Sequence, residues 1–224
     1  MSSIFPILLA GFVAGSVHVV TGPDHLVAVA PLALNQGRQS WLLGIRWGLG
    51  HASGVITVAV AAWLLRELLP IESFSAGCER LVGVMLIGIG LWGLRKALKF
   101  KLHVHEHTHL NDTHQHLHLH RAHSNHARSH VHTHAAFGVG IMHGLAGGSH
   151  FLGVLPALAM PTQLAAGIYL LSFGAGTVLA MTGFSIVFGM IGSKLTSSGA
   201  KYFKGAMATC ASTAIAVGGY WVIS

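Results

Sequence analysis

Long apolar runs separated by short polar segments dominate the chain. Six runs are long enough to cross a bilayer, which takes about 20 residues in a helix, and they occupy residues 4–21, 41–65, 78–98, 136–158, 163–191 and 203–223. Between Arg128 and Lys194 there is no Asp, Glu, Lys or Arg. The pattern predicts an all-α integral membrane protein with six transmembrane helices.

Two of the six runs contain helix-breaking residues. The first reaches Gly22 and Pro23 before a second apolar piece begins, and the fourth is interrupted at Gly147 and Gly148. Backbone groups exposed at such a break are tolerated within a membrane only beside a cavity or site. We therefore expect helices 1 and 4 to be broken at a functional site, the alternative being loops just outside the bilayer.

The two interrupted runs are copies of each other at a constant offset. The matching pairs are Gly15 and Gly140, His18 and His143, Gly22 and Gly147, His25 and His150, Val29 and Val154, and Pro31 and Pro156. A unit of three spans begins and ends on opposite sides of the membrane, so a second copy that follows it has the inverted orientation. The sequence therefore predicts 3+3 inverted repeats, residues 1–98 and 135–224, with substrate sites where the halves meet.

Composition supports the membrane assignment. The chain is 52% hydrophobic and 8% charged, whereas soluble proteins carry about 25% charged residues. Arg66 and Arg80 lie on one predicted side. The other side receives Arg38, Arg46, Arg95, Lys96, Lys99, Lys101, Arg121, Arg128, Lys194, Lys201 and Lys204. This bias predicts a multi-pass protein of the plasma (bacterial inner) membrane with both termini outside. We do not expect nucleic acid as a partner, because the cations flank lipid-embedded spans.

The segment 99–134 is the one sizeable hydrophilic stretch. It holds most of the histidines of the chain, namely His103, His105, His107, His109, His114, His116, His118, His120, His123, His126, His130, His132 and His134. With few apolar residues it cannot form a core, so we expect a disordered cytoplasmic loop. Its imidazoles would capture metal ions; the alternative is a loop whose loss leaves transport intact.

A second set of polar residues lies in apolar surroundings. It comprises His18, Asp24, His25, His51, His143 and His150. Imidazoles with one carboxylate and no thiolate suit Ni²⁺, Co²⁺ or Zn²⁺, whereas Mg²⁺ and Ca²⁺ prefer more oxygen ligands. A single buried histidine is more often structural, but this set favours a functional metal site. We expect no organic cofactor, and we expect Cys78 and Cys210 to be packing residues.

Three motifs resemble those of a known family. The segment His18-Val-Val-Thr-Gly-Pro-Asp24-His25, together with Arg46-Trp-Gly-Leu-Gly-His51 and Met142-His-Gly-Leu-Ala-Gly147, is similar to the nickel/cobalt transporter family, in particular to its UreH-like six-span branch. The resemblance implies that His18, Asp24, His25 and His51 are metal-pathway residues. Larger nickel/cobalt permeases have four residues between the first His and the Asp-His pair, whereas here there are five.

These observations lead to a first hypothesis, a secondary transporter of Ni²⁺ or Co²⁺. Moving a divalent cation out of the cell against an inside-negative potential of 100 mV costs about 4.6 kcal/mol, so export needs coupling. Protons are a candidate coupling ion because they compete with metal for the same ligands. The direction of transport stays open. The alternative is a membrane-anchored metal donor for urease-type metalloenzymes, with a cytosolic metallochaperone or urease accessory protein as partner. We do not expect an enzyme, because no nucleophile–base pair accompanies the site.

Overall fold

The computed structural model describes residues 4–65, 71–99, 103–109, 112–118, 127–146 and 148–223. Within these ranges, the side chains of residues 63, 65, 71–76, 78, 103–134 and 148–152 are not described. The elements are α1 (Ile4–Thr21), α2 (Pro23–Gln36), the short 3-10 helix η1 (Gly37–Gln39), α3 (Ser40–Leu65), α4 (Ile71–Lys99), β1 (His103–His109), β2 (Asp112–His118), α5 (Ala127–Leu145), α6 (Gly148–Leu158), α7 (Gln163–Ser198) and α8 (Ala200–Ile223).

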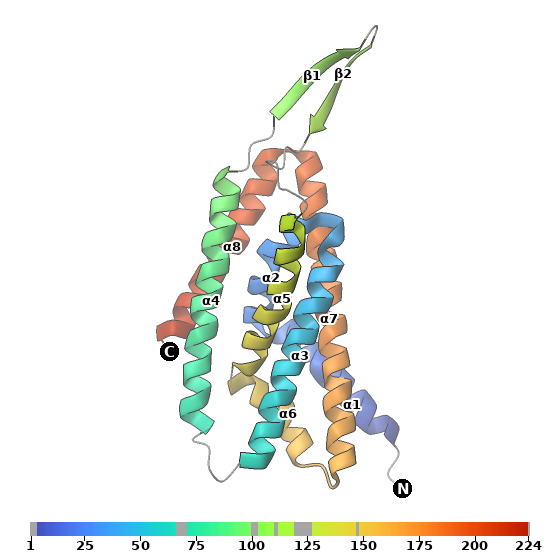
Figure 1. Ribbon diagram of the computed structural model, residues 1–224, viewed down its shortest axis with the longest axis vertical. Helices are drawn as coiled ribbons and strands as arrows, with labels where there is room; N and C mark the ends of the chain where they lie inside the picture. The colour runs from blue at the N-terminus through green and yellow to red at the C-terminus, as the bar shows by residue number, and fades with distance from the viewer. Residues whose placement is uncertain are drawn as a thin grey trace.

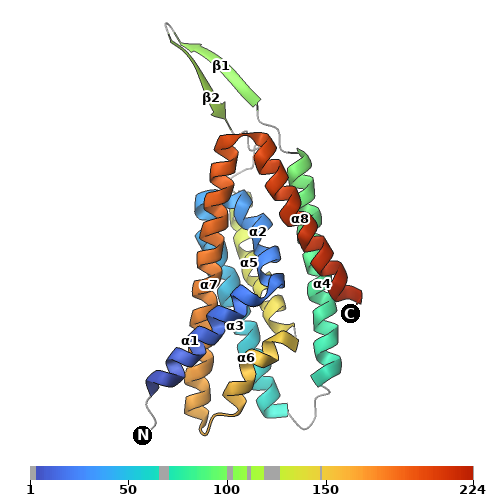
Figure 2. The same cartoon turned by 180° about the vertical axis from the view of Figure 1, so that it is seen from behind.

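The helices run side by side in an elongated bundle, and the β1–β2 hairpin projects from one end of it (Figure 1). The same end carries the connections from α2 to α3 and from α7 to α8, while the N-terminus lies at the opposite end (Figure 2). Helix α1 packs on α7, α3 packs on both α5 and α7, and α4 packs on α8. The short helices α2 and α6 lie between these longer ones.

Four helices in the described part of the chain are long and apolar enough to cross a membrane. They are α1, residues 79–99 of α4, α7 and α8. The predicted spans 41–65 and 136–158 coincide with α3 and with α5 plus α6, but these helices are not in that group. Among the described residues of α5, Ala135–Leu145 form a shorter apolar helix. The protein is therefore a helical multi-pass membrane protein, and the count of six spans stays a prediction.

Close helix contacts depend on glycine at the interfaces. A Cβ atom at Gly15 of α1 would overlap the carbonyl oxygen of Phe173 in α7, and one at Gly140 of α5 would overlap that of Trp47 in α3. Small residues allow helix backbones to approach closely in lipid, where no hydrophobic effect drives helices together. Glycine thus allows tight backbone contacts, among them those of α1 with α7 and of α3 with α5.

The end of α7 differs from the prediction. The apolar run suggested an end at residue 191, but the helix continues to Ser198. The glycines within α7, up to Gly192, keep helical backbone angles, whereas Gly199 has a φ of 131°, which ends the helix and begins the turn into α8. Glycine adopts such a conformation without the steric cost that a side chain would add. At its start, α7 is capped by the Thr162 side chain, which accepts a hydrogen bond from the Ala165 amide at 3.2 Å.

The segment 99–134 requires a correction. We expected it to be disordered, but β1 and β2 form an antiparallel hairpin and α5 begins at Ala127. The register pairs His105 with His116 and His107 with His114. The prediction of disorder gave no weight to the alternation of histidine with residues such as Val104 and Thr108, a period-two pattern compatible with strands.

Candidate metal centre

Four histidines and one aspartate from four helices converge in the interior of the bundle. His18 lies in the last turn of α1, Asp24 and His25 lie in the first turn of α2, His51 is in the middle of α3, and His143 is near the end of α5. The three histidines other than His18 are fully buried, and Asp24 is 2% exposed. His18 is partly exposed.

Three imidazoles face one another within this cluster. The Nε2 atom of His51 lies 3.4 Å from Nε2 of His25 and 3.4 Å from Nε2 of His18. The ring centroids of His18 and His25 are 4.7 Å apart. Metal–nitrogen bonds of about 2.0–2.1 Å place two nitrogens about 3.3–3.4 Å apart around a tetrahedral ion. The observed spacing fits a first-row transition-metal ion held by these three side chains.

The carboxylate of Asp24 contacts two of the histidines. Its Oδ1 lies 3.1 Å from Nδ1 of His25, and its Oδ2 lies 2.9 Å from Nε2 of His143. A buried carboxylate is costly unless it is paired and hydrogen-bonded, and the two ring N–H groups provide that pairing. Asp24 also lies in the first turn of α2, where the helix dipole favours a negative charge.

The break between α1 and α2 places Asp24 and His25. Helix α1 ends at Thr21, Gly22 is the N-cap of α2, and Pro23 occupies the first turn, where its missing N–H costs no hydrogen bond. A Cβ atom at Gly22 would overlap the His25 ring and would lie 2.9 Å from Oδ1 of Asp24. Glycine is therefore required here because the backbone passes directly beside the cluster.

Two aromatic residues that we did not single out from the sequence border the cluster. The Phe173 ring lies 5.6 Å from that of His18, and the Trp47 ring lies 6.2 Å from that of His143. A signal for them exists in the sequence, because Trp47-Gly-Leu-Gly50 and Phe173-Gly-Ala-Gly176 share an aromatic-Gly-x-Gly pattern. These segments lie in α3 and α7, the second helices of the two predicted repeats.

The structure brings together five of the six predicted membrane-embedded site residues. The sixth, His150, belongs to α6 by its backbone, but its side chain lies outside the described residues, as do the side chains of the histidines between 103 and 134. The predicted break in the first run occurs at Gly22. In the second run α5 ends at Leu145 and α6 begins at Gly148, while Gly147 lies outside the described residues.

The helical bundle and its buried cluster define a multi-pass membrane protein with a polar site at the junction of broken helices. The chain belongs to the family described as the cytochrome C biogenesis protein transmembrane region, whose model matches residues 7–221. This is not the nickel/cobalt transporter family that the motifs resemble.

Individual relatives support the UreH-like part of that resemblance. The chain is 32% identical over 191 residues to the urease accessory protein UreH of Bacillus sp. (strain TB-90), covering 84% of this chain and 78% of UreH. It is also 32% identical over 180 residues to the Arabidopsis thaliana chloroplast proteins FOR GROWTH AND FERTILITY 1 and 2. That match covers 80% of this chain but only 48% and 46% of the plant proteins. No solved structure matches the chain.

Proposed function

We propose that the protein is a secondary transporter that carries Ni²⁺ or Co²⁺ across the membrane, with Zn²⁺ as a further candidate substrate. The observation that carries the proposal is the convergence of the His18, His25 and His51 Nε2 atoms, with neighbouring contacts of 3.4 Å, in the bundle interior. Borderline divalent ions prefer imidazole ligands. Ionisable groups within a membrane protein commonly mark an ion pathway.

The packing of the two halves supports an inverted repeat of three spans each. Gly50 of α3 meets the backbone of Phe137 in α5, and Gly176 of α7 meets that of Phe12 in α1. Phe12 and Phe137 are related by the same offset as Gly15 and Gly140. The contact of α3 with α5 thus repeats that of α1 with α7. In transporters built this way the substrate site lies between the halves, where the cluster is found.

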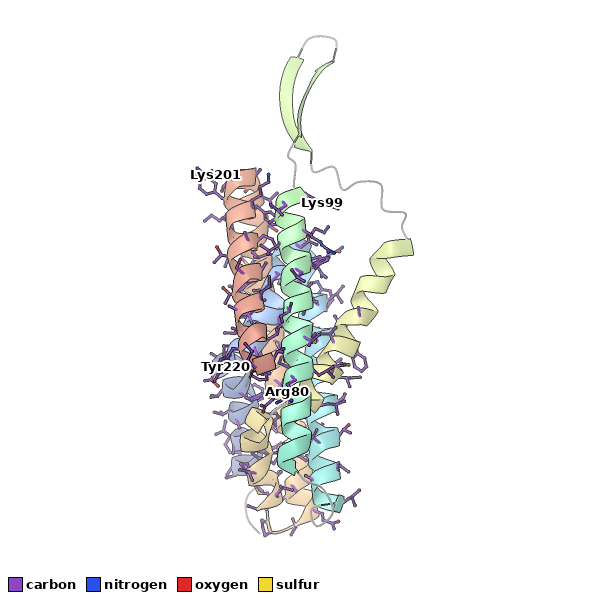
Figure 3. The ribbon with its side chains drawn as sticks, turned by 90° about the vertical axis from the view of Figure 1, so that its left-hand side faces the viewer. Arg80, Lys99, Lys201 and Tyr220 are labelled. Atoms are coloured by element: carbon purple, nitrogen blue, oxygen red, sulfur yellow. The ribbon has the colours of Figure 1, made fainter. Side chains whose placement is uncertain are left out.

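The distribution of charge supports a cytoplasmic hairpin. Lys99 and Lys201 lie at the end of the bundle that carries β1 and β2, whereas Arg80 and Tyr220 lie farther toward the other end (Figure 3). Positively charged residues accumulate on the cytoplasmic side of membrane proteins. In this orientation the histidine-rich segment 99–134 captures or releases the transported metal in the cytoplasm, and both termini lie outside.

Proton coupling follows from the chemistry of the ligands. Histidine and aspartate bind metal only when deprotonated, so protons and metal ions compete for the same atoms. Export against an inside-negative potential of 100 mV costs about 4.6 kcal/mol for a divalent cation, which a proton gradient can offset. Import needs no such coupling. Cellular nickel and cobalt content with and without the gene distinguishes the two directions, since expression lowers it in export and raises it in import.

A membrane-anchored metal donor is the second candidate, because a relative of the chain is named a urease accessory protein. Metal flux separates the two functions. Purified protein is placed in vesicles, and uptake of Ni²⁺ or Co²⁺ is followed with an internal dye. We expect uptake by the wild type and its loss in His51→Ala.

The matched control is Thr177→Val. Thr177 follows the aromatic-Gly-x-Gly pattern in α7 as His51 does in α3, is fully buried, and donates to the Phe173 carbonyl at 2.9 Å. This variant should transport like the wild type, because the threonine is not part of the cluster. Transport is excluded if vesicles with wild-type protein take up no more metal than empty vesicles, or if His51→Ala has no effect.

A further inference from the structure

Both ring nitrogens of His25 face other residues of the cluster. Its Nε2 atom lies 3.4 Å from Nε2 of His51, while its Nδ1 atom lies 3.1 Å from Oδ1 of Asp24. The ligand atoms form two separate groups, His18 with His25 and His51, and Asp24 with His25 and His143, and within each group all atoms lie within 4.8 Å of one another. His25 is the one residue that belongs to both groups.

We propose that the cluster offers two alternative positions to a single transported cation. This inference rests on the transport function proposed above. In the three-imidazole position the ion is bound by His18, His51 and Nε2 of His25. In the carboxylate position it is bound by Asp24, His143 and Nδ1 of His25. The ion passes from one position to the other along the edge of the His25 ring.

The chemistry of imidazole makes the two positions mutually exclusive. A neutral imidazole has one nitrogen with a lone pair and one that carries a hydrogen. When Nε2 of His25 binds the ion, Nδ1 keeps its hydrogen and donates to Asp24, as the 3.1 Å contact allows. When Nδ1 binds the ion, Nε2 carries the hydrogen instead. The exchange takes one proton from Nδ1 of His25 to water and returns one from water to its Nε2. His143 likewise gives its Nε2 proton to water and takes one at Nδ1, so both rings stay neutral.

The two positions differ in exposure and charge. The three-imidazole position includes His18, which is partly exposed, and it has no negative charge. The carboxylate position is made of fully buried His25 and His143 with the 2%-exposed Asp24. An incoming ion therefore meets the imidazoles first and then reaches the carboxylate, which neutralises one of its two charges. The contact of Asp24 with both His25 and His143 keeps the second position assembled before the ion arrives.

Co²⁺ binding to the detergent-purified full-length protein tests this inference. The histidines of segment 99–134 are replaced by asparagine, so that only the membrane cluster reports. Bound cobalt per protein is measured by elemental analysis, and the ligands are identified by X-ray absorption. We expect one Co²⁺ per chain in this background, and still one in His18→Ala and in His143→Ala. His25→Ala should weaken binding by more than about 100-fold, beyond the effect typical of outer-shell changes.

X-ray absorption should also separate the positions. In His143→Ala the ion should have nitrogen ligands from the three imidazoles, and in His18→Ala it should gain an oxygen ligand from Asp24. His18→Gln and His143→Gln replace the alanine variants if either fails to purify as a folded protein. The inference is wrong if either His18 or His143 proves as indispensable for binding as His25, or if the background protein binds two cobalt ions in the cluster at once.

The same variants keep this inference distinct from the transport proposal. If wild-type protein moves metal into vesicles but only one position is found, transport stands and the two-position inference falls. If both positions are found but no metal crosses the vesicle membrane, the positions stand and transport falls. His18→Ala and His143→Ala should each abolish flux while retaining bound Co²⁺, a combination that a single site does not produce.

Discussion

The Nε2 atom of His143 lies 2.9 Å from Oδ2 of Asp24. This contact joins α5, in the second half of the chain, to α2, in the first half. At the positions related by the repeat, Asp24 has Ser149 as its counterpart and His143 has His18. The cluster therefore receives its negative charge from the first half, and it is completed by an imidazole from the second half. Neither half contains all five residues of the cluster.

Asp24→Asn tests the role of that charge. The substitution preserves the size of the side chain and removes its negative charge. We expect the affinity for Ni²⁺ and Co²⁺ to fall by about 10–100-fold, the range typical when a carboxylate that orients metal-binding histidines is altered. The change in affinity is measured by competition with a metal-binding dye. Glu79→Gln in α4 is the matched control, and an equal loss in both variants would contradict a specific role for Asp24.

Gly22→Ala tests the close approach of the backbone to the cluster. The added methyl group would overlap the His25 ring and crowd Asp24. We expect metal affinity to fall at least about 10-fold through displacement of these ligands, while the protein still purifies as a folded monodisperse species. Gly183→Ala in α7, where a Cβ atom meets nothing within 4 Å, should bind metal normally. Unchanged binding in Gly22→Ala would show that His25 tolerates the methyl group.

Gly140→Ala tests the tight contact between α5 and α3. Its Cβ atom would overlap the Trp47 carbonyl oxygen, so the helices must separate. Overpacking of this kind typically costs about 1–3 kcal/mol in the free energy of unfolding. Gly138→Ala is a control two residues away on the same helix, where a Cβ atom meets nothing within 4 Å. Thermal unfolding in detergent should show a lower midpoint for Gly140→Ala alone, and equal midpoints for both variants would contradict the packing.

The sequence predicted the apolar helices well because hydrophobic runs report directly which segments can lie in lipid. The span expected at 4–21 coincides with α1, and the one expected at 203–223 with nearly all of α8. The prediction was weaker where ends depend on local backbone chemistry. Helix α7 extends to Ser198 because its end is set by Gly199 rather than by hydropathy.

The site was predictable in composition but not in geometry. Imidazoles repeated at a fixed offset in apolar segments identified His18, His25 and His143, whereas His51 and Asp24 were identified by their apolar surroundings alone. Sequence spacing cannot show that Asp24 contacts both His25 and His143, since the second contact is between residues more than a hundred positions apart. It also did not reveal Phe173 beside His18, because an aromatic residue in a transmembrane helix usually faces lipid or neighbouring helices.

Thiol labelling tests the proposed orientation. In a background with Cys78→Ser and Cys210→Ser, single cysteines replace Lys201, at the hairpin end of the bundle, or Gln163, at the start of α7. Both positions are exposed. In right-side-out membrane vesicles a membrane-impermeant maleimide should label the cysteine at 163 and not the one at 201. Labelling of 201 alone would place the hairpin outside.

Anomalous X-ray diffraction at the cobalt edge, on crystals of the full-length protein grown with Co²⁺, tests the central claim most directly. We expect a cobalt peak inside the cluster, within bonding distance of His25 and of either His18 and His51 or Asp24 and His143. The peak should be absent in His25→Ala crystals grown in the same way. Cobalt found only at the histidines of segment 99–134, with none among the membrane-embedded imidazoles, would contradict the account.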